Sequence, residues 1–248
     1  MKNKIKQTLN KLINEYRIEH SVVTEWEEPL VGFADANGND IKDLKKFVVD
    51  THFMPSDFLK DASIVISYFL PFTKKLAQSN VDGKISSAEW ALAYQETNKM
   101  AAVLNKNLAS IITEWGYNAA VPDNIGMISE NLIKSRWSQR HIARAAGLGT
   151  FGLNNMLITE KGCCGRFYSI ITTLSVAPDK VIIDENCLYK KEKTCGLCVK
   201  RCISGALTLE YFNRKVCYDI TMENAAIYNG ADVCGKCVVG LPCSFKRP

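Results

Sequence analysis

The sequence predicts an α+β protein in two parts, an α/β core over residues 1–180 and a small cysteine-rich module over residues 181–248. Three observations carry this prediction: two segments have the apolar spacing of helices, one short segment has the composition of a buried strand, and eight of the ten cysteines lie between residues 187 and 243. A chain of 248 residues is long enough for one sizeable core with a small appended module.

The helices of the core are predicted from periodicity. Residues 3–17 repeat apolar side chains at helical spacing, with lysines on the other side. A long helix is predicted from about Ser87 to Trp115, followed by Gly116 at the position of a C-cap. Its apolar stripe is the pattern of a helix that faces a core.

The strands are predicted from composition and turn residues. Residues 64–70, closed by Pro71, have the β-branched content and length of a buried strand. Residues 21–24 and 156–159 are predicted as short strands, and residues 32–39 as the end of a strand with its turn.

Composition narrows the class of protein. Apolar content of 47% and charged content of 23% are typical of a globular domain, and no apolar run approaches the ~18 residues of a membrane span. The N-terminus has no apolar signal core, so we expect a cytoplasmic protein. The net charge is +5, and residues 180–248 carry most of it, with eleven Lys and Arg against seven Asp and Glu. Two anionic metal clusters would offset that surplus, so the charge does not by itself indicate nucleic-acid binding.

The cysteines form a doubled ligand pattern. Each half has a distant cysteine, a C-x2-C pair and one further cysteine, in the order Cys187, Cys195, Cys198, Cys202 and then Cys217, Cys234, Cys237, Cys243. Iron–sulfur clusters use tight cysteine runs of this kind, whereas zinc takes paired C-x2-C knuckles and disulfides need an oxidising compartment. The spacing favours iron–sulfur clusters and leaves structural zinc as the alternative.

Two-cluster ferredoxins exchange ligands between their cysteine runs, because the last cysteine of each run binds the other cluster. Applied here, that rule predicts two groups of four. The first group is Cys187, Cys195, Cys198 and Cys243. The second group is Cys202, Cys217, Cys234 and Cys237.

Three glycines stand close together at Gly147, Gly149 and Gly152, at the end of a helical pattern. Glycine permits close approach of a ligand to the backbone, which makes this turn a candidate binding site; a tight helix-to-strand turn without a ligand is the alternative. A dinucleotide loop of this spacing opens a helix after a strand, so nicotinamide binding is disfavoured.

Residues 144–159, residues 165–174 and the cysteine region together resemble the epoxyqueuosine reductase and reductive dehalogenase family. The features that carry the resemblance are Ala146-Gly147-Leu148-Gly149, Gly152, Asn154, Ile170-Ile171-Thr172-Thr173-Leu174 and the doubled cysteine run, with Trp137-Ser138 and His141 ahead of them. The resemblance implies a nitroreductase-like α/β cobalamin-binding core, a bacterial ferredoxin-like module with two 4Fe–4S clusters, and base-off cobalamin that the clusters reduce.

The resemblance also implies roles for residues. Contacts with the corrin are expected from Gly147, Leu148, Gly149, Gly152 and Asn154, and the eight cysteines are expected to hold the clusters.

Three features depart from the family's pattern. Residues 129–134 lack the family's proton-donating aspartate, Thr173 replaces a second aspartate, and the chain ends at Pro248, before the C-terminal helical repeats of many family members. We therefore expect a short homologue that does not act on tRNA. His141, Glu130 and Arg166 are the candidate catalytic residues.

Two function classes follow. The first is a cobalamin-dependent oxidoreductase that reduces a small-molecule substrate with electrons from a donor such as flavodoxin or ferredoxin. The second is an iron–sulfur electron-transfer protein, or an activator of a partner's corrinoid protein, without substrate chemistry of its own. Neither class calls for a membrane.

Overall fold

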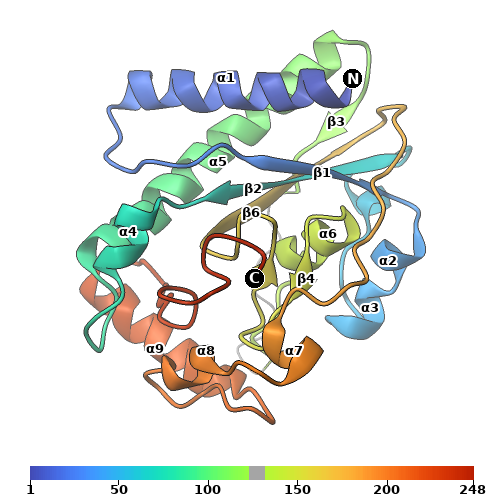
Figure 1. Ribbon diagram of the computed structural model, residues 1–248. Coiled ribbons are helices and arrows are strands. Elements are labelled where there is room, and N and C mark those ends of the chain that lie inside the picture. The colour runs from blue at the N-terminus through green and yellow to red at the C-terminus, as the bar shows by residue number, and fades with distance from the viewer. Residues whose placement is uncertain (123–131) are drawn as a thin grey trace.

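A computed structural model describes residues 1–122 and 132–248 (Figure 1). Its centre is a four-stranded antiparallel sheet in the order β1-β2-β6-β3. The strands are β1 (Leu30–Asp35), β2 (Ile64–Pro71), β3 (Ala119–Ala120) and β6 (Gly165–Thr172). Antiparallel pairing with helices packed on the sheet makes the fold α+β, which confirms the predicted class.

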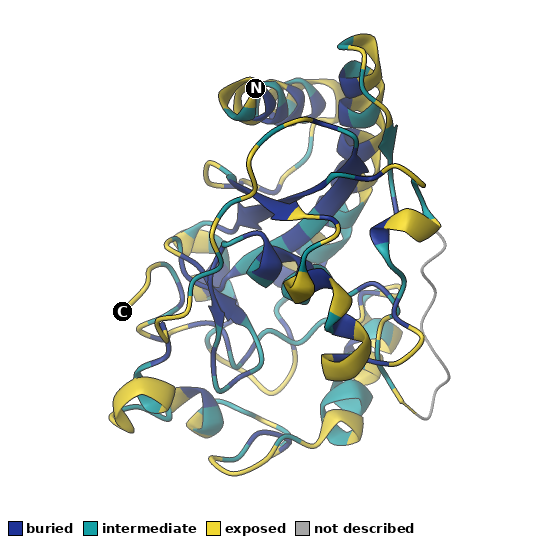
Figure 2. Cartoon of the chain, turned by 90° about the vertical axis from the view of Figure 1, so that its right-hand side faces the viewer, coloured by how far each residue is buried: buried dark blue, intermediate teal, exposed yellow. Residues whose placement is uncertain are grey.

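The sheet is buried on both faces because two helical layers cover it. Along β2, Ile64, Ile66 and Tyr68 point to one face and pack with the apolar residues of α1 (Lys2–His20) and α5 (Ala88–Glu114). Val65 points to the other face, toward α2 (Asn39–Lys42), α3 (Leu44–Phe47) and α6 (Gln139–Ala145). β2 is buried along its whole length, and much of the sheet is dark blue, meaning buried, in Figure 2. This alternation is the two-residue period of a strand.

The helix predictions are confirmed with small shifts of their ends. The expected helix at residues 3–17 is α1, and the expected helix at 87–115 is α5, whose first turn is capped by the Ser87 hydroxyl. Gly116 follows α5 with a φ of +87°, which is the conformation that favours glycine at this position.

The strand at residues 64–70 is confirmed as β2, and the strand at 156–159 as the shorter β5 (Leu157–Ile158), which pairs with β4 (Thr150–Phe151). The strand expected at residues 21–24 is wrong. Ser21 ends α1 in the left-handed conformation, and the Thr24 amide donates to the carboxylate of Glu96 on α5 instead of to a neighbouring strand.

The C-terminal segment returns to the core. It contains α7 (Leu188–Glu192), α8 (Leu197–Lys200) and α9 (Arg214–Ile227), joined by loops that carry the cysteines. Val238 and Val239 pack in the same apolar cluster as α1 and α5, and the Cys163 amide donates to the Cys243 carbonyl over 3.0 Å. Two short elements, η1 (Pro55–Asp57) and α4 (Lys74–Ser79), complete the description. No helix among the described residues is long and apolar enough to cross a membrane.

Candidate redox site

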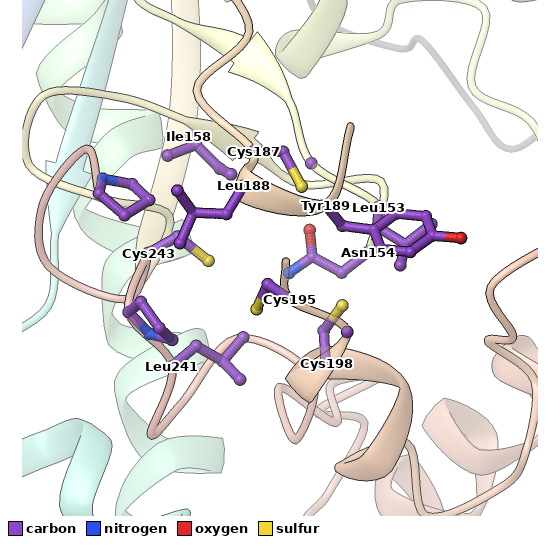
Figure 3. A pocket seen from close by; sticks show the side chains of 14 residues that line it. Leu153, Asn154, Ile158, Cys187, Leu188, Tyr189, Cys195, Cys198, Leu241 and Cys243 are labelled. Carbon is purple, nitrogen blue, oxygen red and sulfur yellow. The ribbon is translucent and has the colours of Figure 1, made fainter. Parts of the chain in front are cut away.

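The first cysteine group lines one cavity. Cys187, Cys195, Cys198 and Cys243 surround about 370 Å³ of space, part of it open to solvent (Figure 3). The rest of the lining is mostly apolar, with side chains such as Leu153, Ile158, Leu188, Tyr189 and Leu241. The four cysteines are the set that ligand exchange between the two runs predicts, and three of them come from a segment 45 residues or more before the fourth.

Charge coupling within this group raises a thiol pKa. Burial, together with the nearby thiolates of Cys243, Cys187 and Cys195, raises the pKa of Cys198 to about 11. Like charges this close disfavour one another, so the group favours the thiolate state only when a cation or a cationic cluster shares the space.

The second group, Cys202, Cys217, Cys234 and Cys237, shows the same coupling. Burial raises the pKa of Cys237, and the charges of Cys234, Cys217 and Cys202 add to the effect. The pKa of Cys237 also responds to Cys198, so the two groups adjoin at this pair of residues.

Short-range contacts hold the second group in place. The Leu207 amide donates to the Cys202 sulfur over 3.4 Å, a contact of the kind that tunes iron–sulfur clusters. The Asn154 amide donates to the Cys237 carbonyl over 2.7 Å, and Asn80 donates to the Cys234 carbonyl over 2.8 Å.

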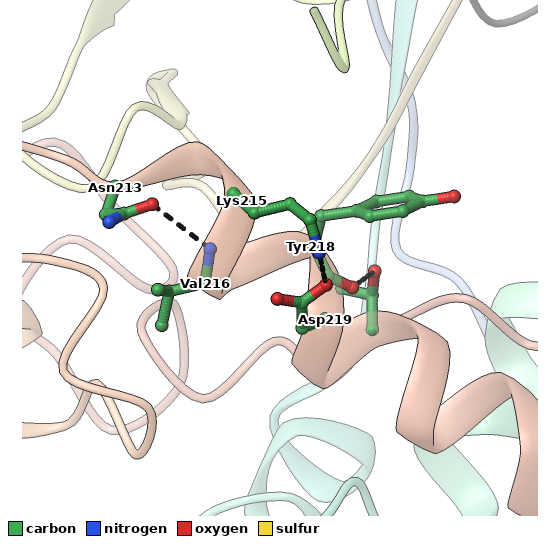
Figure 4. A network of polar contacts seen from close by, with 6 residues as sticks. Asn213, Lys215, Val216, Tyr218 and Asp219 are labelled. Carbon is green, nitrogen blue, oxygen red and sulfur yellow. Dashed lines mark hydrogen bonds and ion pairs between the residues drawn. The ribbon is translucent and has the colours of Figure 1, made fainter. Parts of the chain in front are cut away.

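Cys217 is positioned by the first turn of α9. The Asn213 side chain accepts from the Val216 amide over 3.1 Å and starts the helix, and Lys215 pairs with Asp219 one turn on (Figure 4). Rigid placement of the first turn sets the direction in which Cys217 points.

The donor set fits iron–sulfur chemistry, because each group supplies four cysteines from separate segments. Within residues 1–122 and 132–248, no three His, Cys, Asp or Glu side chains are grouped to hold a single metal ion. Eight thiolates in two groups of four are the ligand number of two 4Fe–4S clusters.

Two further features surround the second group. The Lys236 ammonium is buried and donates to the carbonyl oxygens of Asn80 and Asp82, over 3.1 and 2.6 Å. Trp90 is also buried, and in the described part of the chain its indole N–H has no hydrogen-bond partner. A side chain added at Gly235, between Cys234 and Cys237, would meet this indole nitrogen at 2.4 Å.

Three arginines converge beside the second group. Burial lowers the pKa of Arg140, the positive charges of Arg214 and Arg166 lower it further, and Cys237 and Cys217 oppose the shift. Among the described residues, the only arginine in an ion pair is Arg144. Arg140 uses one terminal nitrogen to donate to the Asn155 carbonyl over 2.8 Å, and no carboxylate neutralises the three guanidinium groups through an ion pair in that part of the chain. The sequence prediction singled out Arg166 but missed Arg140 and Arg214, because a convergence from α6, β6 and α9 has no local signature.

Arg166 has its own cradle of aromatic and amide groups. Its guanidinium lies 4.3 Å from the centre of the Tyr94 ring and donates to the Tyr168 hydroxyl over 3.2 Å. Tyr168 donates in turn to Asn98 over 2.7 Å. These contacts fix the guanidinium while its terminal nitrogens stay available.

The other two candidate catalytic residues are Glu130 and His141. Glu130 lies outside the described residues. Nδ1 of His141 lies 2.7 Å from the Ser138 hydroxyl, and its ring packs 4.5 Å from Phe151. Burial lowers the pKa of His141 to about 4, so the imidazole is neutral at pH 7 and is a poor source of a proton there.

The glycines of the predicted corrin site contact the protein itself. A Cβ at Gly147 would lie 2.5 Å from the Lys180 carbonyl oxygen, and one at Gly149 would lie 2.2 Å from that of Ile158. A Cβ at Gly152 would lie 2.7 Å from the Asn154 side chain. Close packing against protein atoms therefore accounts for all three glycines.

Leu148 and Asn154 are also occupied by the protein. Leu148 is buried against Phe69 and Phe167, and Asn154 uses its amide on Cys237. Gly152 and Asn154 line the cavity of the first group, whereas Gly147, Leu148 and Gly149 do not. The five residues expected to contact a corrin therefore do not form one open cradle, and contact between them and a corrin stays a prediction.

Cys163 and Cys164 are buried beneath the first group. A hydrogen bond with Cys243 and burial raise the pKa of Cys163, and the same hydrogen bond lowers the pKa of Cys243. Burial raises the pKa of Cys164 to about 12, and its thiol donates to the Val238 carbonyl over 3.0 Å. Both are packed thiols, and Cys163 lies next to Cys243 of the first group.

The fold of the chain matches those of known proteins. The epoxyqueuosine reductase from Streptococcus thermophilus superposes with a TM-score of 0.59 at 18% identity, over 95% of this chain and 66% of that one. The Bacillus subtilis enzyme gives 0.55 at 18%, over 97% and 66%. An epoxyqueuosine reductase with a modified tRNA stem loop gives 0.57 at 16%, over 97% and 66%.

The chain has the epoxyqueuosine reductase fold. The predicted resemblance is thus confirmed over nearly the whole chain, including the N-terminal third. The chain spans about 66% of the length of those enzymes. No protein-family model matches the sequence, and no curated protein matches it significantly.

Proposed function

We propose that this chain is an iron–sulfur oxidoreductase that carries electrons through two 4Fe–4S clusters to an acceptor beside Arg140, Arg166 and Arg214. The observation that carries the proposal is the division of the eight cysteines into two groups. Each group is coupled within itself, and the two adjoin through Cys198 and Cys237. Adjacent clusters suit the transfer of electrons from one to the other, and a carrier alone would need only a small domain of about 55–80 residues.

The chain's own residues supply three functions in this reaction. The cysteines hold the clusters, the apolar lining of the first group lowers the polarity around its cluster, and the arginines attract and orient an anionic acceptor. The Tyr94 and Tyr168 contacts hold Arg166 in a fixed direction, so less entropy is lost when it binds an anion.

The fold suggests a corrinoid as the acceptor cofactor, which then reduces a small-molecule substrate. Cobalamin would supply a strongly reducing cobalt centre. Because the five residues assigned to it are occupied by protein contacts, we derive no step through it, and its binding has to be measured.

The protein contacts made by these five residues favour a second candidate, an electron-transfer protein that reduces a partner's corrinoid without substrate chemistry of its own. Gly147 and Gly149 pack on the carbonyl oxygens of Lys180 and Ile158, as a turn without a ligand would. The two candidates share the clusters and differ only in whether a corrinoid binds to this chain.

The first test is metal content. Anaerobically purified protein should contain about eight iron atoms and about eight sulfides per chain. Stoichiometric zinc without labile sulfide would overturn the proposal.

The second test is cobalamin binding. Under anaerobic conditions the protein is titrated with hydroxocobalamin and its absorbance is followed for the base-off form. Binding supports the corrinoid-dependent reductase, and its absence from protein with intact clusters supports the electron-transfer protein. Gly149→Val is not a suitable control, because its side chain would collide with the Ile158 carbonyl.

The third test concerns tRNA. Opening an epoxide requires a proton donor, which typically contributes ~10²–10⁴ in rate, and residues 129–134 lack the family's aspartate. We therefore expect weak or no restoration of queuosine in a strain without epoxyqueuosine reductase. Full restoration would make tRNA the substrate.

A further inference from the structure

An apolar spot is exposed next to a ligand of the first cysteine group. Leu197 and Leu209 are 41% and 42% exposed, although both are large aliphatic side chains. A Cβ at Gly196 would lie 3.2 Å from the Leu209 side chain, so Leu209 rests on the residue that follows Cys195. Cys195 is half-buried, whereas Cys187 and Cys198 are buried. Cys243 is half-buried as well, so Cys195, beside these two leucines, is one of the two places where the first group comes nearest to solvent.

Exposed lysines lie on the two short helices, α7 and α8, that flank Cys195 in the chain. Lys190, Lys193 and Lys200, from α7, its C-cap and α8, are exposed and belong to no ion pair among the described residues. Their neighbour Lys191 pairs with Glu192 at 3.8 Å. The Lys193 ammonium lies 4.7 Å from the centre of the Tyr189 ring, which lines the cavity of the first group. Both helices lie at the foot of the molecule in Figure 1, and the helices there are largely exposed in Figure 2.

We propose that this surface, formed by Lys190, Lys193, Leu197, Lys200 and Leu209 and called here the α7–α8 face, docks an acidic one-electron carrier protein. The proposal rests on the proposed function, since it requires a cluster in the first group. The rim is mostly basic, with Glu192 and Glu210 as its exposed acidic residues. A small apolar centre with a rim of net positive charge is the arrangement of a transient protein interface that uses electrostatic steering.

The position of the face determines the order of electron transfer. The first group lies under the α7–α8 face, and the second group adjoins Arg140 and Arg214. An electron that enters at the face therefore reaches the first cluster, then the second, and then the acceptor beside the arginines. The donor loses one electron, the oxidised cluster gains it, and no bond is made or broken.

An RNA partner is less well matched to the face. RNA binding uses an extended basic surface with aromatic side chains for stacking, whereas this face has aliphatic residues at its centre and few cations.

The test measures reduction of the clusters by a bacterial flavodoxin in its hydroquinone state, mixed anaerobically with the cluster-loaded protein in a stopped-flow instrument. Dithionite serves as a small reductant that needs no docking surface. The variant is Lys190→Glu with Lys193→Glu. The matched control is Lys60→Glu with Lys106→Glu, which makes the same charge change at exposed lysines on the η1–β2 loop and α5.

We expect the α7–α8 variant to slow reduction by flavodoxin at least ~10-fold at low ionic strength, because steering raises association rates 10-fold or more. The difference should shrink as salt is added. Reduction by dithionite should be unchanged, and the control pair should differ from the wild type by less than about twofold in both assays. Leu209→Ser should raise the flavodoxin concentration needed for a given rate of cluster reduction. The salt dependence of that rate should stay as in the wild type.

Equal rates with flavodoxin for the wild type and both double variants would overturn the proposal. So would displacement of flavodoxin by bulk tRNA, with loss of tRNA binding in the α7–α8 variant, because the face would then bind RNA. If the α7–α8 variant assembles its clusters poorly, Lys200→Glu alone provides the same comparison. Absence of labile sulfide in the wild type would instead refute the proposed function.

Discussion

Substituting Gly235 by alanine should selectively disrupt the second cluster. Gly235 lies between Cys234 and Cys237, two proposed ligands of the second cluster, and has a φ of +74°. An added Cβ would meet the Trp90 indole at 2.4–2.6 Å, from three of its atoms. Trp90 cannot move away easily, because it is buried and packs edge-on against Phe72 with ring centres 5.1 Å apart.

Two costs add up at this position. A left-handed conformation costs an L residue about 1–2 kcal/mol, and overpacking a well-filled core typically costs about 1–3 kcal/mol. Gly235→Ala should therefore destabilise the cluster loop by about 2–5 kcal/mol. Gly230→Ala is the matched control, because Gly230 has a φ of +87° but nothing within 4 Å of the added Cβ. Gly230→Ala should therefore cost only the about 1–2 kcal/mol of the left-handed conformation.

The assay is iron and sulfide content after anaerobic reconstitution, combined with electron paramagnetic resonance of the reduced protein. We expect Gly235→Ala to lose about half of the iron and the signal of one cluster, while Gly230→Ala keeps both. Adding Trp90→Leu to Gly235→Ala should recover part of the lost iron. If Gly235→Ala and Gly230→Ala retain iron equally, the contact with Trp90 does not constrain the loop and the reasoning is refuted.

Three further predictions follow from the site. Cys198→Ala should remove the first cluster and leave about four iron atoms per chain. Cys163→Ala should leave the iron content unchanged. Iron analysis of both variants checks this prediction. The pKa of His141 is about 4 in the folded protein, below the unfolded value of about 6.5. The unfolded chain therefore binds the proton first as the pH falls, and the free energy of unfolding decreases by about 1.4 kcal/mol per pH unit between pH 6.5 and 4. Above about pH 6.5 the stability is at its full value. Urea unfolding at several pH values should show this loss, and His141→Gln should flatten it. Lys236→Met should lower the midpoint potential of the second cluster and leave that of the first nearly unchanged, as measured by redox titration.

The elements that sequence predicted well are those with a local cause. The helix of residues 87–115 has a capping serine, a periodic apolar face and a terminal glycine, and all three agree with α5. The strand at residues 64–70 has a continuous apolar run because both of its faces are covered. Its pairing with β6 could not be predicted, since it joins Ile64 to Thr172 across 108 residues and depends on the complete fold.

The glycine turn shows why one observation supported two interpretations. Glycine is required wherever any atom approaches the backbone closely, and the sequence does not say whether that atom belongs to a ligand or to the chain. At Gly149 it is the Ile158 carbonyl oxygen of the adjacent β5. That Cys187, Cys195, Cys198 and Cys243 lie around one cavity could be predicted from the repeated cysteine spacing. The arginine group could not, because it joins residues up to 74 positions apart.

The charges around the two groups give electron transfer a direction, and the Lys236 prediction tests it. Reduction adds one negative charge to a cluster, which nearby buried cations stabilise. The Lys236 ammonium is electrostatically coupled to Cys234, and Arg140 to Cys237 and Cys217, all proposed ligands of the second cluster. The lining of the first group is mostly apolar, which disfavours added charge. The second cluster should therefore have the higher potential, so that electrons entering at the first run toward the arginines. Lys236→Met removes a cation beside the second cluster only, so it should lower the potential of that cluster and reduce the difference between the two potentials. Equal shifts at both clusters would show that Lys236 acts through the whole module and not through its charge beside the second group.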